Sequence, residues 1–323
     1  MTNNKNMISP IAIITSIFIA CMGQPEHSII AKNEIAAPYQ WKKIRNNAAF
    51  PKSYNFQIFS FNDTLWALHP RGTYFSADGK DWDKTPLVHF IKNSAFLDFV
   101  YFKGAIYGLG TFDGNIEHYT MTGAIAKTSD CRNWEVLSKE SKLPRRFFYH
   151  PFVFKDKIWI IGGHDGKEDQ ADIWNSEDAI HWTKVKDQLP FGKRANSQIV
   201  TLNDRLFLLN NDVWSSSDGI NWTRVTPEIV KGQQIFGYAA VVFDNRIFLL
   251  GCNRNGEFTS KVLHSADGKN WQEMDAPWSA RGGIAACVHQ GKIYMTGGKY
   301  GGTPEHTEFI YSNDVWALQR AGL

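Results

Sequence analysis

The residues best suited to chemistry are three arginines, Arg146, Arg194 and Arg281, each of which opens an apolar stretch that ends in a polar turn. A guanidinium group presents a planar fork of donors that matches a carboxylate, so three at one register could form an anion-binding site. The alternative is that each arginine braces neighbouring loops through backbone carbonyl groups. The segments that follow the apolar stretches supply further candidate ligand contacts, which are His164, Arg254 and Tyr300.

Other catalytic patterns are missing from the sequence. The histidines have no metal-ligand spacing and Cys-x-x-Cys does not occur, so we predict neither a metal site nor a cofactor. Gly-x-Ser-x-Gly, which marks one class of serine nucleophile, is also absent. The net charge is +3 and no run of Lys and Arg exists, which argues against a nucleic-acid partner.

A repeated unit positions these residues, and its shortest copy lies between Arg194 and Trp222. We predict four short strands in it, separated by polar residues that tolerate positive φ or bond back to the backbone. The strands, a to d, are expected to end at Leu202, to run from Leu206 to Leu209, to surround Val213–Trp214 and to begin at Trp222. The predicted turns are Asn203–Asp204 between a and b, and Ser216-x-Asp218-Gly219 between c and d.

The unit occurs six times. An aliphatic–aromatic pair recurs in strand b of every copy: Leu65–Trp66, Ile106–Tyr107, Ile158–Trp159, Leu206–Phe207, Ile247–Phe248 and Ile293–Tyr294. The aspartates of the c–d turn are predicted to be structural: Asp78, Asp130, Asp178, Asp218 and Asp267. Tryptophans at the start of strand d are predicted to be mostly buried: Trp82, Trp134, Trp182, Trp222 and Trp271. Such a repeat is typical of an array of small antiparallel sheets.

The two ends of the repeat complement each other. The sixth copy stops after Trp316 without a fourth strand, and the first begins with an extra strand around Trp41. A ring closed by this N-terminal strand would leave no exposed sheet edge. We therefore predict an all-β, six-bladed β-propeller over residues 39–323, in which residues 39–45 pair antiparallel with the segment near 309–317.

The N-terminal segment predicts export. Residues 1–21 hold a short apolar stretch that ends in Phe-Ile-Ala-Cys, which resembles the bacterial lipobox with Cys21 as the acylated residue. An ordinary signal peptide and an uncleaved anchor are the alternatives. Residues 22–38 would form a tether, which makes the protein a membrane-anchored lipoprotein or a periplasmic or extracellular protein. The remaining cysteines, Cys131, Cys252 and Cys287, are expected to be unpaired.

Only the connection between strands b and c varies strongly in length, and it is long in copies two, three, five and six. Insertions confined to one face of a repeat protein usually mark its binding face. We therefore expect the ligand at the b–c face.

The repeat resembles the kelch motif. Residues 281–298 read Arg, an apolar strand, a turn, an aliphatic–aromatic pair and Gly297-Gly298, followed later by Trp316. Residues 146–163 with Trp174 are similar, and the other copies are more degenerate. The Ser-x-Asp-Gly-x-x-Trp box is also similar to the Asp-box of sialidases, but one residue shorter. The resemblance implies a propeller whose b–c face binds ligands.

Two functions remain open on the sequence. The favoured one is a non-catalytic, monomeric recognition module for a protein or a glycan, with an anionic ligand as one option and no membrane contact except a lipid anchor. The alternative is a kelch-type sugar enzyme acting on an anionic sugar, similar to the sialic-acid epimerases. The arginines would then suit the anion and loop carboxylates the proton transfers.

Overall fold

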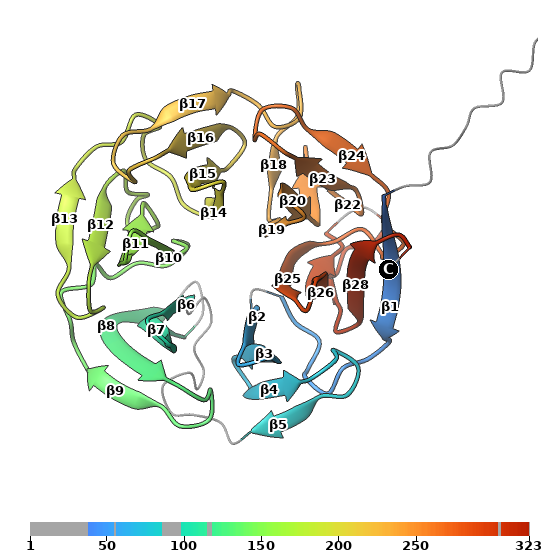
Figure 1. Ribbon diagram of the computed structural model, residues 1–323, viewed down its shortest axis with the longest axis horizontal. Helices are drawn as coiled ribbons and strands as arrows, with labels where there is room; N and C mark the ends of the chain where they lie inside the picture. The colour runs from blue at the N-terminus through green and yellow to red at the C-terminus, as the bar shows by residue number, and fades with distance from the viewer. Residues whose placement is uncertain (1–37, 55, 86–97, 115–117, 303–304, 323) are drawn as a thin grey trace, which may run out of the picture. The chain divides into compact units, whose positions relative to one another are not determined.

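Paired turn residues set the strand pattern that Figure 1 shows. The computed structural model describes residues 38–54, 56–85, 98–114, 118–302 and 305–322, without the side chains of 113 and 114. Within these residues the regular structure is all β, with strands β1 to β28 and no helix. The signal segment 1–21, Cys21 and nearly all of the tether lie outside the described residues.

Most of the strands form small antiparallel sheets in chain order. The first two sheets are β2 (Gln57–Phe61), β3 (Thr64–His69), β4 (Gly72–Ser76) and β5 (Asp83–Thr85), then β6 (Asp98–Phe102), β7 (Ala105–Gly114), β8 (Tyr119–Thr128) and β9 (Glu135–Ser138). The next two are β10 (Phe152–Phe154), β11 (Lys157–Ile161), β12 (Ile173–Ser176) and β13 (Thr183–Lys186), then β14 (Gln198–Leu202), β15 (Arg205–Leu209), β16 (Val213–Ser216) and β17 (Thr223–Thr226).

Strands later in the chain depart from this simple order. One sheet contains β19 (Ala239–Phe243), β20 (Arg246–Leu250), β23 (Val262–Ser265) and β24 (Gln272–Met274). Another contains β25 (Gly282–His289), β26 (Lys292–Tyr300), β28 (Val315–Arg320) and β1 (Tyr39–Arg45), with β27 (Ile310–Tyr311) beside β26. A small sheet contains β18 (Ile235–Phe236), β21 (Cys252–Arg254) and β22 (Glu257–Thr259).

The N-terminal strand joins the last sheet. β1 pairs antiparallel with β28, with Tyr39 opposite Arg320 and Arg45 opposite Val315. The expected antiparallel pairing of residues 39–45 is therefore present. Its partner is Val315–Arg320 rather than the whole predicted segment 309–317, because β27 ends at Tyr311 and pairs with β26 instead.

The predicted turns follow from backbone conformation. Asn203 and Asp204 both have positive φ, as do the residues at the matching turns of other sheets, which suits the right-handed twist of a two-residue hairpin. In the c–d box, Asp218 Oδ1 accepts the backbone N–H groups of Ile220 and Asn221. The structural role predicted for the box aspartates is confirmed there.

Four of the boxes also accept a hydrogen bond from a tryptophan. The indole N–H groups of Trp82, Trp182, Trp222 and Trp271 donate to the carbonyl oxygen of the residue three positions earlier, at 2.7–3.1 Å. Trp82, Trp182 and Trp222 are buried, whereas Trp134 and Trp271 are only partly buried. Strand d begins one residue after each of these tryptophans.

The core lies between neighbouring sheets. One cluster joins Phe56 and Leu65 to Ala285 and Tyr294, which come from opposite ends of the chain. In Figure 1 the strands β2, β6, β10, β14, β19 and β25 stand innermost around a common centre. The cysteines Cys131, Cys252 and Cys287 are buried and free, as predicted.

Candidate functional site

The three candidate arginines are engaged in ion pairs. Arg146 donates to both carboxylate oxygens of Asp172, at 2.5 and 2.8 Å, and to the carbonyl oxygen of Gly162. Arg194 is paired in the same way with Asp212 and donates to the Phe191 carbonyl oxygen. These are the loop contacts of the brace alternative raised from the sequence.

Arg281 shows how complete such a brace can be. Its side chain is 2 % exposed, and its five N–H groups face Asp314, the Gly297 carbonyl and both oxygens of Ser279. Asp314 also accepts the indole N–H of Trp316. Although burial alone would raise it, the Arg281 guanidinium holds the pKa of Asp314 below its usual value. No donor of Arg281 is left to bind a ligand.

A short sequence pattern, Asp-x-Trp, accompanies these braces. Asp-x-Trp occurs at Asp172–Trp174, Asp212–Trp214 and Asp314–Trp316. In each case the indole N–H donates to the aspartate, at 2.7–2.8 Å, and the aspartate pairs with the arginine. An aspartate that recurs in the same copies as a repeated arginine predicts an ion pair between the two residues within each copy.

The other predicted contacts are not on free loops. Arg254 ends β21 and forms an ion pair with Glu273 at 2.6 Å, and Tyr300 ends β26, where its ring contacts His306. His164 follows β11, and its Nδ1 lies 2.8 Å from Asp169. Part of the long b–c connections forms β-strands, such as the β21–β22 hairpin, which the length count alone did not reveal.

A different site emerges at the centre of the sheets. A cavity of about 360 Å³ is lined by residues of β2, β6, β14, β19 and β25 and by residues just before β10. Six lining residues share one register, four positions before the end of the innermost strand. They are Gln57, Asp98, His150, Gln198, Ala239 and Ala285.

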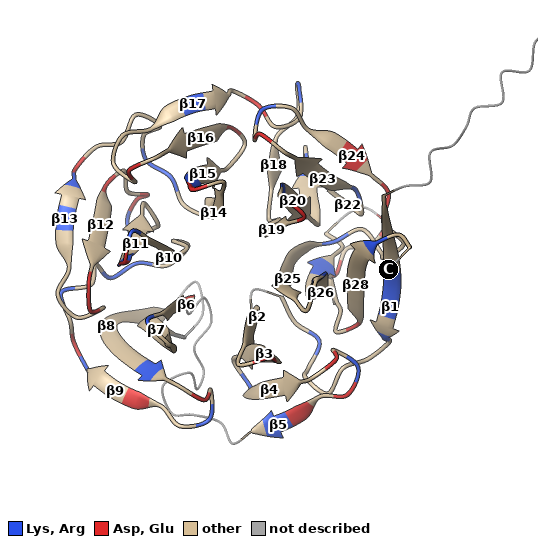
Figure 2. Ribbon diagram, viewed as in Figure 1, with Lys and Arg blue, Asp and Glu red and all other residues tan. Residues whose placement is uncertain are grey.

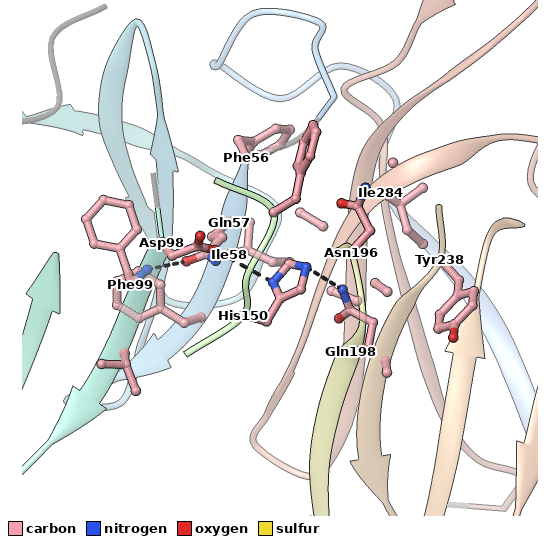
Figure 3. A pocket seen from close by; sticks show the side chains of 18 of the residues that line it. Phe56, Gln57, Ile58, Asp98, Phe99, His150, Asn196, Gln198, Tyr238 and Ile284 are labelled. Atoms are coloured by element: carbon pink, nitrogen blue, oxygen red, sulfur yellow. Dashed lines mark hydrogen bonds and ion pairs between the residues drawn. The ribbon is translucent and has the colours of Figure 1, made fainter. Parts of the chain in front are cut away.

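Four of these six side chains form a polar belt (Gln57, Asp98, His150 and Gln198), which Figure 3 shows. Gln57 Nε2 donates to Asp98 Oδ1 at 3.4 Å, and Asp98 Oδ1 lies 3.7 Å from His150 Nδ1. Gln198 Nε2 lies 2.8 Å from His150 Nε2. Since the amide nitrogen can only donate, His150 Nε2 accepts, which leaves the proton of the neutral ring on Nδ1, toward Asp98.

Burial sets the charge of the belt. It raises the pKa of Asp98 well above the usual value and lowers the pKa of His150 to about 4. The His150 side chain is nevertheless 32 % exposed, because it faces the cavity. At neutral pH the belt therefore offers a neutral imidazole beside a carboxyl group that resists ionisation.

Ala239 and Ala285 complete the register with methyl groups, so the belt covers only part of the circumference. The space left beside them is bordered by Phe56, which packs with Ala285, and by Ile284, which packs with Ala239. The cavity thus combines a polar arc of amides, imidazole and carboxyl with an apolar arc. Among the described residues that line it, none is Lys or Arg.

Apart from Asp98, the charged residues that the structure describes lie outside the cavity lining. In Figure 2 the blue and red segments gather on outer strands and connecting turns, and the innermost strands β2, β14, β19 and β25 are drawn tan. A site of this composition favours a neutral, hydrogen-bonding ligand over an anion.

The backbone at the start of the innermost strands is also unusual. Two positions before the belt register, Phe148, Asn196, Gly237 and Gly283 all have positive φ and all line the cavity. Glycine and asparagine accept this conformation readily, but a bulky residue such as Phe148 is strained in it. A strained aromatic residue at a cavity indicates a functional constraint.

The described residues contain neither a metal-binding cluster nor a membrane-spanning helix. No three His, Cys, Asp or Glu side chains come close enough together to hold a metal ion there. Nor is there, in the same residues, a helix with the length and apolar character needed to cross a bilayer.

Small antiparallel sheets around a central cavity define the class of the protein, a β-propeller. More narrowly, the chain belongs to the family of the DUF6242 beta propeller domain, whose model matches residues 11–186 and 133–275. The solved structure titled "Structure of YjhT" is similar, with a TM-score of 0.69 and 12% identity over 85% of this chain and 97% of that one. At this identity the likeness shows the fold alone. No curated protein matches the chain.

Proposed function

We propose that the protein is a recognition module that binds a neutral saccharide, or the neutral end of a glycan, in the central cavity. The observation that carries this proposal is the division of one repeat register into a polar arc and two alanines. Saccharides present hydroxyl groups along an edge and C–H groups on a face, which matches a lining that combines amides with aromatic rings. The absence of Lys and Arg among the described lining residues argues against the anionic ligand considered from the sequence.

Filling the space beside the alanines tests this location. Ala239→Leu and Ala285→Leu should each abolish binding of a neutral oligosaccharide, because the added side chain occupies the ligand's volume. Gln198→Ala should weaken binding about three- to tenfold, the effect of one neutral hydrogen bond. The measurement is a glycan array followed by titration calorimetry, with neutral and acidic oligosaccharides compared.

Ala49→Leu is the matched control, since Ala49 is exposed and lies outside the cavity lining. Binding that survives both cavity-filling substitutions, in folded protein, would show that the ligand sits elsewhere. A ligand restricted to acidic saccharides would instead contradict the assignment of a neutral ligand to this cavity.

An enzyme acting on a sugar is the second candidate, favoured by the contact between Asp98 and His150. A carboxyl group and an imidazole side by side in a cavity can give and take a proton. Asp98→Asn should then abolish turnover of a neutral mono- or disaccharide, followed by NMR, while binding persists. Turnover that is unchanged in this variant would exclude the pair from catalysis.

We infer further that the sheets form a six-bladed ring of kelch type that β1 closes. The antiparallel β1–β28 pairing supports this, as do the Arg–Asp–Trp contacts shared by three sheets. Deleting residues 38–45 should expose β28 along one edge and lower the melting temperature of the whole propeller. An unchanged melting temperature would contradict closure.

Export and lipidation remain proposals from the sequence of residues 1–21. If Cys21 is acylated, Cys21→Ser should move the protein from the detergent phase to the aqueous phase, or leave it uncleaved. Unchanged partitioning would favour simple secretion or a retained anchor. We also expect the exported protein to be a monomer, which its sedimentation can test.

A further inference from the structure

The last residue of each innermost strand is apolar in five sheets and polar in one. Phe61, Phe102, Phe154, Leu202 and Phe243 end β2, β6, β10, β14 and β19. His289 ends β25 and is 2 % exposed. Since an imidazole in a position that the repeat reserves for phenylalanine is costly unless it is hydrogen-bonded, its partners show why it stands there.

His289 is held between two oxygen atoms. Its Nδ1 lies 2.8 Å from Ser60 Oγ on β2, and its Nε2 lies 3.4 Å from the backbone carbonyl oxygen of Ala77. A carbonyl oxygen can only accept, so Nε2 carries the proton of the neutral ring. Nδ1 then has a free lone pair, and it accepts the hydroxyl proton of Ser60.

Ser60 differs from its partner in being accessible. Ser60 is exposed and lines the central cavity, three positions after Gln57 on β2. An exposed hydroxyl that donates to a buried imidazole, oriented in turn by a third group, is the arrangement that activates serine nucleophiles. The pattern was invisible in the sequence because the two residues are 229 positions apart.

We propose that Ser60 is a nucleophile with His289 as its general base, and that it transfers the acyl group of a carboxylic ester. Ser60 Oγ attacks the carbonyl carbon as its proton passes to His289 Nδ1. The ester C–O bond then breaks, the proton goes from His289 to the departing alcohol, and the acyl group stays on Ser60. Water, deprotonated by His289, releases the acid and restores the serine. This activity is independent of saccharide binding at the polar belt.

A covalent probe tests the pair directly. We expect an alkyl fluorophosphonate to form a bond between its phosphorus and Ser60 Oγ with loss of fluoride, located by peptide mass spectrometry. Ser60→Ala should abolish this adduct. His289→Phe should slow it about 100-fold, the contribution of a positioned general base. Hydrolysis of 4-nitrophenyl acetate should fall in parallel in both variants.

His289→Phe is well matched because four other sheets carry phenylalanine at this position, so the fold should accept it. Should it fail to fold, His289→Gln removes the base with a smaller change, and the same fall is expected. Thr201 is an internal control: it occupies the register of Ser60 in β14, but the corresponding residue of the preceding sheet is Phe154. It should remain unlabelled.

Three results would overturn the proposal. They are the absence of an adduct on Ser60 in the native protein, labelling of His289→Phe at the native rate, or equal labelling of Ser60 and Thr201. None depends on whether a saccharide binds, and the cavity-filling variants can be tested separately. Failure of one proposal is therefore distinguishable from failure of the other.

Discussion

Two polar arrangements of the propeller, the Arg–Asp–Trp brace and the polar belt, differ in how often they occur. The Arg–Asp–Trp brace is built three times, around Asp172, Asp212 and Asp314, with nearly the same contacts. The polar belt of Gln57, Asp98, His150 and Gln198 occurs once, with one side chain from each of four sheets. The brace recurs with the same contacts, which indicates a structural role in the repeat. The belt forms once, from side chains of several sheets, which indicates a role in binding a ligand between the sheets.

The brace and the belt also differ in how completely their carboxylates are paired with hydrogen-bond donors. Each brace aspartate accepts two donors from an arginine and one from an indole. The paired arginine holds the pKa of Asp172 and of Asp314 below the usual value. In the belt, Asp98 has contacts of 3.4 and 3.7 Å, and burial raises its pKa. The brace is complete without a ligand, and the belt retains hydrogen-bonding capacity that a ligand can use.

Breaking a brace should give the largest effect. Arg281→Ala leaves the mostly buried Asp314 without its cation, and we expect a loss of about 3–5 kcal/mol in the free energy of unfolding. Urea unfolding measures it. Arg145→Ala is the control, because the Arg145–Glu140 pair is about half exposed and should contribute about 1 kcal/mol or less. Equal losses in the two variants would show that the braces are not structural.

Removing the belt carboxyl should have the opposite sign. Burial raises the pKa of Asp98, so the folded protein keeps a proton on this carboxyl group that the unfolded chain loses above about pH 4. The free energy of unfolding therefore falls as the pH rises above that value. Asp98→Asn should therefore stabilise the protein at pH 7, by about 1–2 kcal/mol. Asp172→Asn, the same change in a brace, should destabilise it. If both variants are destabilised, the distinction between belt and brace fails.

Much of the fold could be predicted from the sequence because it is repeated. Six aliphatic–aromatic pairs and the Ser-x-Asp boxes fixed strands and turns to within one or two residues, and the contacts of Asp218 and Trp222 are those expected. The β21–β22 hairpin was missed, since it lies in a connection that no other copy shares. Only the length of that connection was informative.

The candidate site could not be predicted in the same way. Repetition drew attention to Arg146, Arg194 and Arg281, yet conformity to a motif indicates a structural role as readily as a functional one. The belt lies at a register occupied by two glutamines, an aspartate, a histidine and two alanines, so no motif contains it. Aligning the copies on the ends of strand a would have placed Asp98 beside His150, and His289 beside five apolar residues.

Acid titration can sharpen the comparison further. Burial lowers the pKa of His150 to about 4, below the usual 6.5. Between these two pH values the unfolded chain binds the proton and the folded protein does not. The contribution of His150 to the free energy of unfolding is therefore present above about pH 6.5 and is lost as the pH falls toward 4. In His150→Gln this part of the dependence, about 1–2 kcal/mol after allowance for the exposed part of the ring, should disappear. Parallel stability–pH curves for the native protein and the variant would contradict it.

The smallest change in stability is expected at Phe148. Its φ of 58° matches that of Asn196, which stands at the same register in the next sheet. Phe148→Asn relieves a backbone strain of about 1–2 kcal/mol but removes a ring that packs 4.6 Å from Phe147, so the net change should be within about 1 kcal/mol.

Binding should respond differently to the same substitution. If the strained ring is kept for the cavity, Phe148→Asn should weaken saccharide binding about two- to tenfold, the range for an aromatic contact. Ala179→Gly is the control, since Ala179 also has positive φ but lies in a c–d box away from the cavity lining. It should leave binding unchanged in the same calorimetric titration. If Phe148→Asn binds as tightly as the native protein, the strain belongs to the fold, as the braces do, and Phe148 is not part of the binding site.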